Sequence, residues 1–430
     1  MTVPVIILLF FVFLILAVPI SSALAMVASI PGAFDDSFTA SGGYVVRSMI
    51  SGIDSFPLLA IPMFVLSGVI MAKGGISKKL FEVCLYFIGT MTAGMPCAVV
   101  ITCLFYGAIS GSAPATVAAV GSMTIPILVN MKYDKVFAVS LVAIAGGLGV
   151  IIPPSIPFIL YGTASGASVG KLFMAGILPG ILIAVLLMGY AIIYCRKHGE
   201  DRESIDQAVT ELRAKGFGKL LFESIWALLT PVIILGCIYT GIASPTEAAV
   251  ISVFYSLLVA ICFYQTIKLG DLFDIFREAA RTYAPILFIL AASVAFSRVL
   301  TIMQVPTIIR DVIFNNFQGA VAILLVINIA LLFVGMIMDV GPAIMILTPI
   351  LLPIVREIGV DPVHFGVIMV VNLCIGFVTP PVGINLFVAS SMSGVPVLSI
   401  AKKAVPMIVA FLVALVLITF IPWISLALVR

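Results

Sequence analysis

Long apolar stretches separated by short polar turns make up most of this chain. Many reach the roughly 20 residues that a helix needs to span a bilayer, as over 172–195, 220–240 and 272–300. The pattern predicts one first membrane helix over 1–30, followed by a polar connector over 31–52. The only long charged segment, 196–219, is expected to be a surface loop with an amphipathic turn or two. The sequence therefore predicts an all-α polytopic membrane protein.

Glycine and proline interrupt four apolar stretches, and the interruptions repeat. The segment 149–154 reads GVIIPP and 376–381 reads GFVTPP, with the prolines 153 and 380 lying 227 residues apart (380 − 153). Upstream, Pro114 and Pro342 lie 228 residues apart (342 − 114). Two motifs at nearly one offset indicate two structural repeats, each with two helix breaks. Such paired interruptions are typical of transporter binding sites near the bilayer midplane.

These repeats divide the chain into a first repeat over 1–195, a charged linker over 196–219 and a second repeat over 220–430. Each repeat is expected to hold scaffold spans, a re-entrant helical hairpin and a broken helix. The hairpins are predicted at about 96–129 and 320–355, and the broken helices at about 137–165 and 363–392. Because proline suits the first turn of a helix, four half-helices are expected to begin at Pro114, Pro154, Pro342 and Pro381. The prolines that form the breaks are Pro114, Pro153, Pro154, Pro342, Pro380 and Pro381.

Composition narrows the class of protein. The chain is 63% hydrophobic and 10% charged, whereas a soluble protein has about a quarter of its residues charged. No dense basic patch supports nucleic-acid binding. The seven cysteines form no Cys-x-x-Cys, so we interpret them as apolar packing residues.

The first apolar run is too long for a signal-peptide core, and the lysine-rich turn 73–79 predicts a cytoplasmic N-terminus.

A broken helix can bind ions of either sign. Half-helix N-termini favour an anion, and free carbonyl ends favour a cation. Carbonyl oxygens together with hydroxyl side chains suit a hard monovalent cation such as sodium, and the breaks lack the carboxylates that a calcium site needs. We therefore expect sodium ions as the only metal and an organic anion as substrate. The hydroxyl residues at the breaks are Ser110, Ser112, Thr116, Ser155 and Thr379.

Five other polar residues lie in apolar surroundings, and three of them permit two interpretations. Asp339 could bind an ion or simply cap the helix that follows it. Glu247 is interpreted as structural, because an acid in a first turn needs only the helix dipole. Arg298 could reach a membrane interface by snorkelling. Asn372 and Asn385 could bridge helices or contact substrate.

Two other functions compete with transport. Ser110 or Ser112 with His364 could form the serine–histidine pair of an intramembrane hydrolase, but the chain has no Gly-x-Ser-x-Gly. A passive anion channel is the second alternative. The doubled, two-fold related breaks favour alternating access over both.

Three motifs resemble the large membrane subunit of the tripartite ATP-independent periplasmic (TRAP) transporters. They are AISGSAPAT at 108–116, IIPPS at 151–155 and VTPPVGIN at 378–385, and the resemblance covers essentially the whole chain. It implies a bacterial inner-membrane transporter, not an enzyme, that has no organic cofactor and takes up an organic anion with sodium. Sialic acid is the favoured substrate and a C4-dicarboxylate the next. The implied partners are a periplasmic substrate-binding protein and a small four-helix membrane subunit on a separate chain.

The resemblance further implies two inverted repeats and an elevator mechanism, in which the hairpins and broken helices slide against a scaffold. It places one sodium site at Ser110, Ser112, Gly149 and Val150, and the other at Asp339, Gly341, Gly376 and Thr379. We expect Thr116, Ser155 and Asn385 to bind the substrate. The two sites need not be equivalent, because Val382 stands where the first repeat has Ser155.

Overall fold

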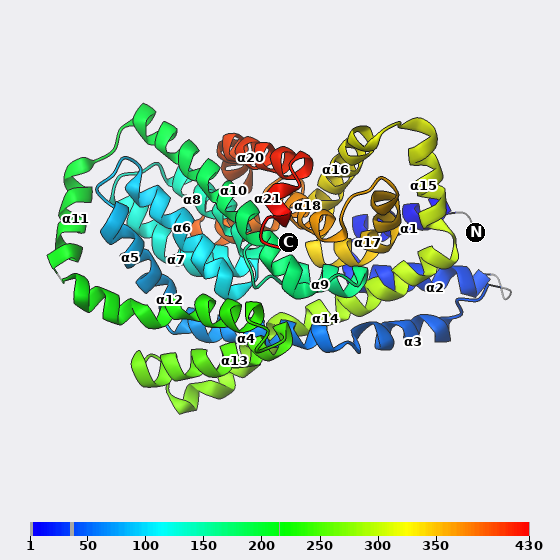
Figure 1. Ribbon diagram of the computed structural model, residues 1–430, viewed down its shortest axis with the longest axis horizontal. Helices are drawn as coiled ribbons and strands as arrows, with labels where there is room; N and C mark the ends of the chain where they lie inside the picture. The colour runs from blue at the N-terminus through cyan, green and yellow to red at the C-terminus, as the bar shows by residue number, and fades with distance from the viewer. Residues whose placement is uncertain (1–2, 35–37, 215, 430) are drawn as a thin grey trace.

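The computed structural model describes residues 3–34, 38–214 and 216–429, and every regular element in this part of the chain is a helix. Nine of these helices are long and apolar enough to cross a membrane. The predicted all-α membrane fold is therefore confirmed. In Figure 1 the light-blue and cyan helices of residues 76–145 lie at the left, whereas the dark-blue N-terminal helices lie at the right with the yellow and orange helices, and the long helix α14 (Leu272–Ile302) runs between these two groups.

The N-terminal region differs from the prediction. Instead of one helix over 1–30, the chain forms α1 (Val3–Ile15) and α2 (Ile20–Phe34). Pro19 disfavours helical geometry at the residue before it, and Ala17 adopts a positive φ of 58°, so the helix ends there. The predicted polar connector is also largely helical, since α3 spans Gly42–Ile53. The connector's residues 35–37 lie outside the described part.

Two helix pairs occupy the segments where the hairpins are predicted. The first pair is α6 (Gly94–Ser110) with α7 (Ala113–Asn130), and the second is α16 (Ala320–Ile337) with α17 (Val340–Glu357). The first pair turns at Gly111, whose φ of +61° suits glycine. A Cβ at Gly111 would lie 2.9 Å from the carbonyl oxygen of Pro154, so this tip is packed inside the protein.

The two predicted broken helices are interrupted where the proline pairs stand. Helix α8 (Lys135–Ala145) continues as a 3₁₀ turn, η2 (Gly146–Val150), and the chain resumes as α9 (Ile156–Ser165). In the second half, α18 (Pro362–Gly376) stops and α19 (Ile384–Ser393) follows. Both Pro-Pro peptide bonds are cis.

The expected helix starts hold at two breaks and are wrong at the other two. Pro114 and Pro342 do lie in the first turns of α7 and α17. Pro154 and Pro381 instead lie before α9 and α19. A proline restricts the residue before it to extended geometry, so two in a row keep the chain non-helical for longer. Helix α9 begins only after Ser155, whose side chain accepts a hydrogen bond from the backbone N–H of Phe158.

Helix α14 packs against elements of both halves. It contacts α2, α3 and α4 (Ala60–Lys73) on one side and α17 on the other. At Gly52 a Cβ would lie 2.6 Å from the Val294 side chain, so α3 and α14 are in close contact. Helix α4 also packs on α13 (Pro245–Leu258), where the Ser67 and Ser256 hydroxyls are 2.8 Å apart.

The segment predicted as a surface loop contains an ordered helix. Helix α10 extends from Val169 to His198, and α11 spans Arg202–Ala214 before α12 begins at Phe217 and runs to Tyr239. Ile205, Val209 and Leu212 of α11 are buried, and α11 packs on α5 (Ile76–Ile88). The linker is thus an amphipathic helix, seen at the left edge of Figure 1.

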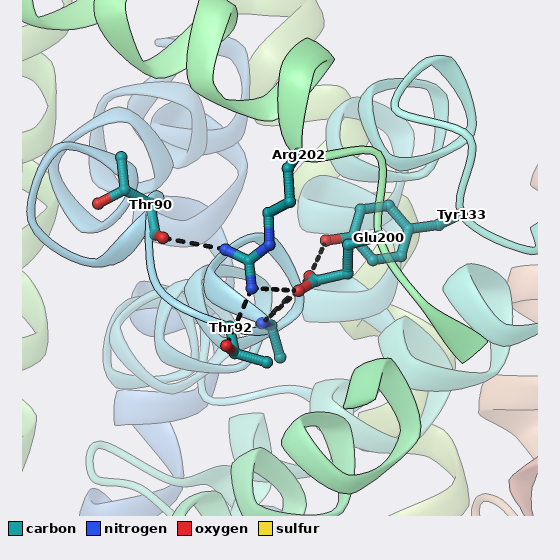
Figure 2. Close-up of polar contacts among 6 residues, drawn as sticks. Thr90, Thr92, Tyr133, Glu200 and Arg202 are labelled. Atoms are coloured by element: carbon teal, nitrogen blue, oxygen red, sulfur yellow. Dashed lines mark hydrogen bonds and ion pairs between the residues drawn. The ribbon is translucent and has the colours of Figure 1, made fainter. Parts of the chain in front are cut away.

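A buried carboxylate holds the α10–α11 junction in place (Figure 2). The Glu200 side chain is 3% exposed. It accepts hydrogen bonds from the Ala93 N–H at 3.1 Å and from the Tyr133 hydroxyl at 2.6 Å, and it forms an ion pair with Arg202 at 3.0 Å. Arg202 also donates to the carbonyl oxygen of Thr90. The linker is therefore fixed to the loops at the base of the first helix pair.

The same junction shifts the pKa values of groups outside the membrane-spanning helices. Lys132 pairs with Asp201 at 2.7 Å, and the hydrogen bond from Lys132 lowers the pKa of Asp201. Burial, followed by the hydrogen bond to Glu200, raises the pKa of Tyr133. Tyr133 is therefore a neutral donor to Glu200 at physiological pH.

Candidate functional site

The turn between α6 and α7 gathers three hydroxyl residues. The Thr116 hydroxyl donates to the Ser112 carbonyl oxygen at 2.8 Å and lies 3.0 Å from the Ser110 hydroxyl. The Ser110 hydroxyl also accepts from the Ser112 N–H at 3.4 Å. These contacts give the hairpin tip a dense set of oxygen atoms.

The first broken helix lies directly against this tip. A Cβ at Gly149 would be 2.4 Å from the Thr116 hydroxyl and 2.8 Å from the Ser112 carbonyl oxygen, so only glycine allows this approach. The Ile156 N–H donates to the Gly111 carbonyl oxygen at 3.4 Å.

Six of the predicted site residues therefore come together in a single cluster. Ser155 joins it through its hydroxyl, which donates to the carbonyl oxygen of Val150. The members of the cluster are Ser110, Ser112, Thr116, Gly149, Val150 and Ser155.

In the second half, the hairpin and the broken helix also touch through glycine. A Cβ at Gly376 would lie 2.1 Å from the carbonyl carbon of Gly335 on α16. The Val382 N–H donates to the Met336 carbonyl oxygen at 3.2 Å. The Thr379 hydroxyl, which lies just beyond the end of α18, donates to the Ile375 carbonyl oxygen in the last turn of that helix at 2.8 Å.

Asp339 acts as the cap of the second hairpin's returning helix. Its carboxylate accepts a hydrogen bond from the N–H of Val340, the first residue of α17, at 2.8 Å, and so satisfies one of the free N–H groups at the helix start. This bond engages one carboxylate oxygen, so the geometry leaves ion binding open.

The two hairpin tips meet at a cavity of about 130 Å³, which we call the inner cavity. Ser112 and Val150 line it from the first half, and Asp339 and Gly341 line it from the second. Gly376 and Thr379 do not line it, although their neighbour Phe377 does. The structure thus brings together the oxygen atoms of the first predicted site and only the hairpin half of the second.

A larger cavity of about 780 Å³ adjoins the inner cavity, with Ser112, Pro114 and Ile286 lining both. This large cavity lies between α7 and the helices α4 and α14, and it reaches the lysine-rich turn after α4. Lys73 pairs there with Glu278 at 2.7 Å.

Lys78 is a functional candidate that the sequence analysis missed. It lines the large cavity and forms no ion pair with any residue that the structure describes. The sequence signal was the cluster of lysines in the turn 73–79, which we used only to orient the chain.

The three residues predicted to bind substrate are buried and line neither of these cavities. The hydroxyls of Thr116 and Ser155 donate to the carbonyl oxygens of Ser112 and Val150 within the first cluster. The Asn385 amide donates to the Ala143 carbonyl oxygen at 3.1 Å and so bridges α19 to α8. Its carbonyl oxygen has no partner among the described residues.

Neither a serine–histidine pair nor a metal cluster forms within the described ranges. His364 is buried and its ring lies 3.3 Å from the Thr419 carbonyl oxygen. No group of three or more His, Cys, Asp or Glu side chains there could hold a metal ion. The oxygen atoms that the structure places at the helix breaks are hydroxyl and carbonyl oxygens with the Asp339 carboxylate.

Comparison with known proteins places these features in a family context. The profile described as "Tripartite ATP-independent periplasmic transporter, DctM component" matches residues 7–424. The isethionate TRAP transporter permease protein DctMQ of Oleidesulfovibrio alaskensis is 44% identical over 417 residues, and the match covers 96% of this chain and 64% of that protein. The C4-dicarboxylate TRAP transporter large permease protein DctM of Pseudomonas aeruginosa is 40% identical, with 87% of this chain and 86% of that protein covered.

A more distant relative and a solved structure extend the comparison. The sialic acid TRAP transporter large permease protein SiaM of Vibrio cholerae is 33% identical over 385 residues, and the match covers 90% of this chain and 89% of that protein. The crystal structure of the Alcanivorax borkumensis YdaH transporter superposes with a TM-score of 0.64 and covers 98% of both chains. At 15% identity, this second likeness shows a shared fold.

Proposed function

Because the chain belongs to the DctM family of tripartite ATP-independent periplasmic transporters, we propose that it carries an organic anion across the bacterial inner membrane with sodium. The observation that carries this proposal is the inner cavity, where the tips of both hairpins meet. Irregular backbone at membrane depth is tolerated only where it is buried or lines a cavity. An ion-coupled carrier needs such a place, and a purely structural membrane protein does not.

Sodium coupling is supported by the kind of atoms at the cavity. Ser110, Ser112 and Thr116 offer hydroxyl and carbonyl oxygens within 3.3 Å of one another. Ser112 lines the inner cavity, and Asp339 adds one carboxylate across it. This donor set suits sodium, which we treat as a co-transported substrate. Each repeat would bind sodium at its hairpin and break, with Gly376 and Thr379 completing the second site after a small rearrangement.

The transported substrate is proposed to be a small organic acid. A cavity of about 780 Å³ lies within the usual range for small-molecule sites, and Lys78 supplies a positive charge in it. The relatives are named for isethionate, C4-dicarboxylate and sialic acid, all of which carry a sulfonate or a carboxylate. We keep sialic acid as the favoured substrate and a C4-dicarboxylate as the next. Isethionate is tested as a third candidate because a relative is named for it.

Two partner chains belong to this proposal. We expect a periplasmic binding protein to deliver the anion and a small four-helix membrane subunit to pair with this one. The match covers 64% of the relative named DctMQ, so that relative also contains sequence to which this chain does not align.

The test of energetics is uptake into proteoliposomes that contain both membrane subunits, with the binding protein outside. Radiolabelled isethionate, succinate and sialic acid are compared under an inward sodium gradient. We expect uptake of one of them without ATP, and Ser110→Ala should raise the sodium concentration needed for half-maximal rate. Equal uptake with potassium replacing sodium on both sides would refute the coupling.

The elevator mechanism is tested by cross-linking across the large cavity. Val69 on α4 and Ala118 on α7 both line it, so a thiol cross-link between cysteines at these positions joins the scaffold to the first hairpin. We expect this link to stop uptake. A matched link between Ala115 and Ile156, which line the same cavity and belong to the moving part, should leave uptake intact. A channel would keep conducting with either link.

A further inference from the structure

A second polar cleft lies along α14 at the end opposite the large cavity. It has a volume of about 320 Å³ and is lined by residues of α3, α9, α14 and α17. One cation, Arg298, stands among hydroxyl side chains. We call this space the Arg298 cleft, and its hydroxyl residues are Ser51, Ser55, Thr163, Ser297 and Thr301.

The Arg298 guanidinium has unused donors. Its Nη1 donates to the Ser51 hydroxyl at 2.6 Å, and within the described part of the chain it forms no ion pair. By contrast, Lys73 is neutralised by Glu278 and Arg310 by Glu357. A guanidinium carries five N–H donors, and its planar fork matches a carboxylate or a similar oxyanion.

The cleft has walls that belong to different parts of the proposed transporter. Helices α3 and α14 form one wall and are in close contact at Gly52 and Val294. Helices α9 and α17 form the other, through Thr163 and Met345. Both α9 and α17 start at the helix breaks that surround the inner cavity.

The inner cavity and the Arg298 cleft therefore share the same helices. At 1.5 Å rise per residue, Thr163 lies about 10 Å along α9 from Ile156, which lines the inner cavity. By the same measure Arg298 lies about 18 Å along α14 from Ile286. A snorkelling arginine would face lipid and headgroups, whereas this one faces a hydroxyl-lined cleft between helices that also border the inner cavity.

We propose that the Arg298 cleft binds the carboxylate or sulfonate group of the organic anion on the side of the protein opposite the Lys73–Lys79 turn. The anion is held there before the helix breaks move toward that side and accept it. The choice of an organic anion as the ligand rests on the proposed function, but the affinity of the cleft for anions does not. An experiment can therefore refute the proposed transport function without refuting anion binding in the cleft, and the reverse.

The test measures charge selectivity without transport. Thr301 is exposed and one turn from Arg298 on the same helix, so the side chains are about 6 Å apart. Cysteine is placed at Thr301 after Cys84, Cys237 and Cys262, which are at least partly exposed, are changed to serine. The rates of reaction with sulfonatoethyl and trimethylammoniumethyl methanethiosulfonate are then compared.

A unit charge about 6 Å away in water changes the local concentration of a monovalent ion about three-fold, so the ratio of the two rates should fall about ten-fold in Arg298→Gln. Arg298→Lys should keep most of the ratio, because it keeps the positive charge at the cleft. Arg277→Gln is the matched control, because Arg277 is exposed on the same helix and lines none of the three cavities. An unchanged ratio in Arg298→Gln, or an equal fall in the control, would overturn the proposal.

A protection experiment then identifies the ligand class. Isethionate, succinate or sialic acid, added alone, should slow the reaction of cysteine at 301 at least three-fold, and Arg298→Gln should abolish this protection. If the cleft selects anions by charge but none of the three protects it, the inference of an organic-anion site is wrong. If one of the three anions protects the cysteine while uptake is independent of sodium, the anion site in the Arg298 cleft is supported and the proposed sodium coupling is wrong.

Discussion

Replacing Glu200 by alanine should loosen the junction between α10 and the linker helix α11. The carboxylate is almost fully buried and holds three groups: the Ala93 N–H, the Tyr133 hydroxyl and the Arg202 guanidinium (Figure 2). Alanine would leave the first two without an acceptor. Arg202 would keep its bonds to the Thr90 carbonyl oxygen and the Thr92 hydroxyl, so the junction would be weakened without losing every contact.

The size of the effect follows from those lost partners. A buried polar group left unsatisfied costs about 1–3 kcal/mol. Water can enter the loosened junction, so we take about 3 kcal/mol for the two groups together. At about 1.4 kcal/mol per factor of ten, local opening of the junction becomes roughly a hundred-fold more frequent.

Hydrogen exchange followed by mass spectrometry measures this opening directly. Peptides that contain Ala93 or the start of α11 should exchange about a hundred times faster in Glu200→Ala, whereas peptides from α14 should not change. Glu203→Gln is the control, because Glu203 is an exposed acid in the first turn of α11. The reasoning fails if the Glu200 variant exchanges at the original rate, or if the Glu203 variant shows the same acceleration.

Two further results are expected. Gly376→Ala should prevent a stable fold in detergent, because its Cβ would fall 2.1 Å from the backbone of Gly335. Gly189→Ala, where nothing lies within 4 Å, should purify normally, and equal yields of the two variants would contradict the close contact. Arg310 forms an ion pair with Glu357 across the contact between α15 (Val305–Asn316) and α17, so Arg310→Gln should weaken that contact by up to about 1 kcal/mol. Exchange in α15 should therefore be up to about five-fold faster in Arg310→Gln than in the original protein, and equal rates would contradict a stabilising ion pair.

The features that were predicted correctly from the sequence depend on residues close together along the chain. Glycine and proline act on their own backbone, so the positions of the helix breaks could be foreseen. Glu247 was interpreted as structural, and it does close a capping box with Ser244 at 2.7 Å. The prediction was wrong where two prolines in succession delayed the start of α9 and α19, because their restrictions add to each other.

Contacts between distant residues could not be foreseen. Glu200 binds Ala93 and Tyr133, which precede it by 107 and 67 residues. In the sequence Glu200 was one acid among several in a charged linker. Arg298 could not be assigned from the sequence for the same reason. An arginine that reaches the membrane surface and one that faces a cleft have the same sequence pattern, and only the fold shows that α9 and α17 lie opposite Arg298. The bridging interpretation of Asn372 is confirmed by its bond to Asn328 at 2.7 Å, although the sequence did not identify the partner.

The shared wall along α14 has an electrical consequence. Ile286 is the last residue of α14 that lines the large cavity and Val294 is the first that lines the Arg298 cleft, and about 12 Å of helix separates them at 1.5 Å per residue. The hydrocarbon core of a bilayer is about 30 Å thick. With water in both spaces and α14 along the membrane normal, the membrane voltage falls over the shorter distance, so the local field is about 2.5 times stronger than in the surrounding lipid. An ion crossing this layer still gains the full 2.3 kcal/mol per charge for each 100 mV, but it does so within a displacement of about 12 Å.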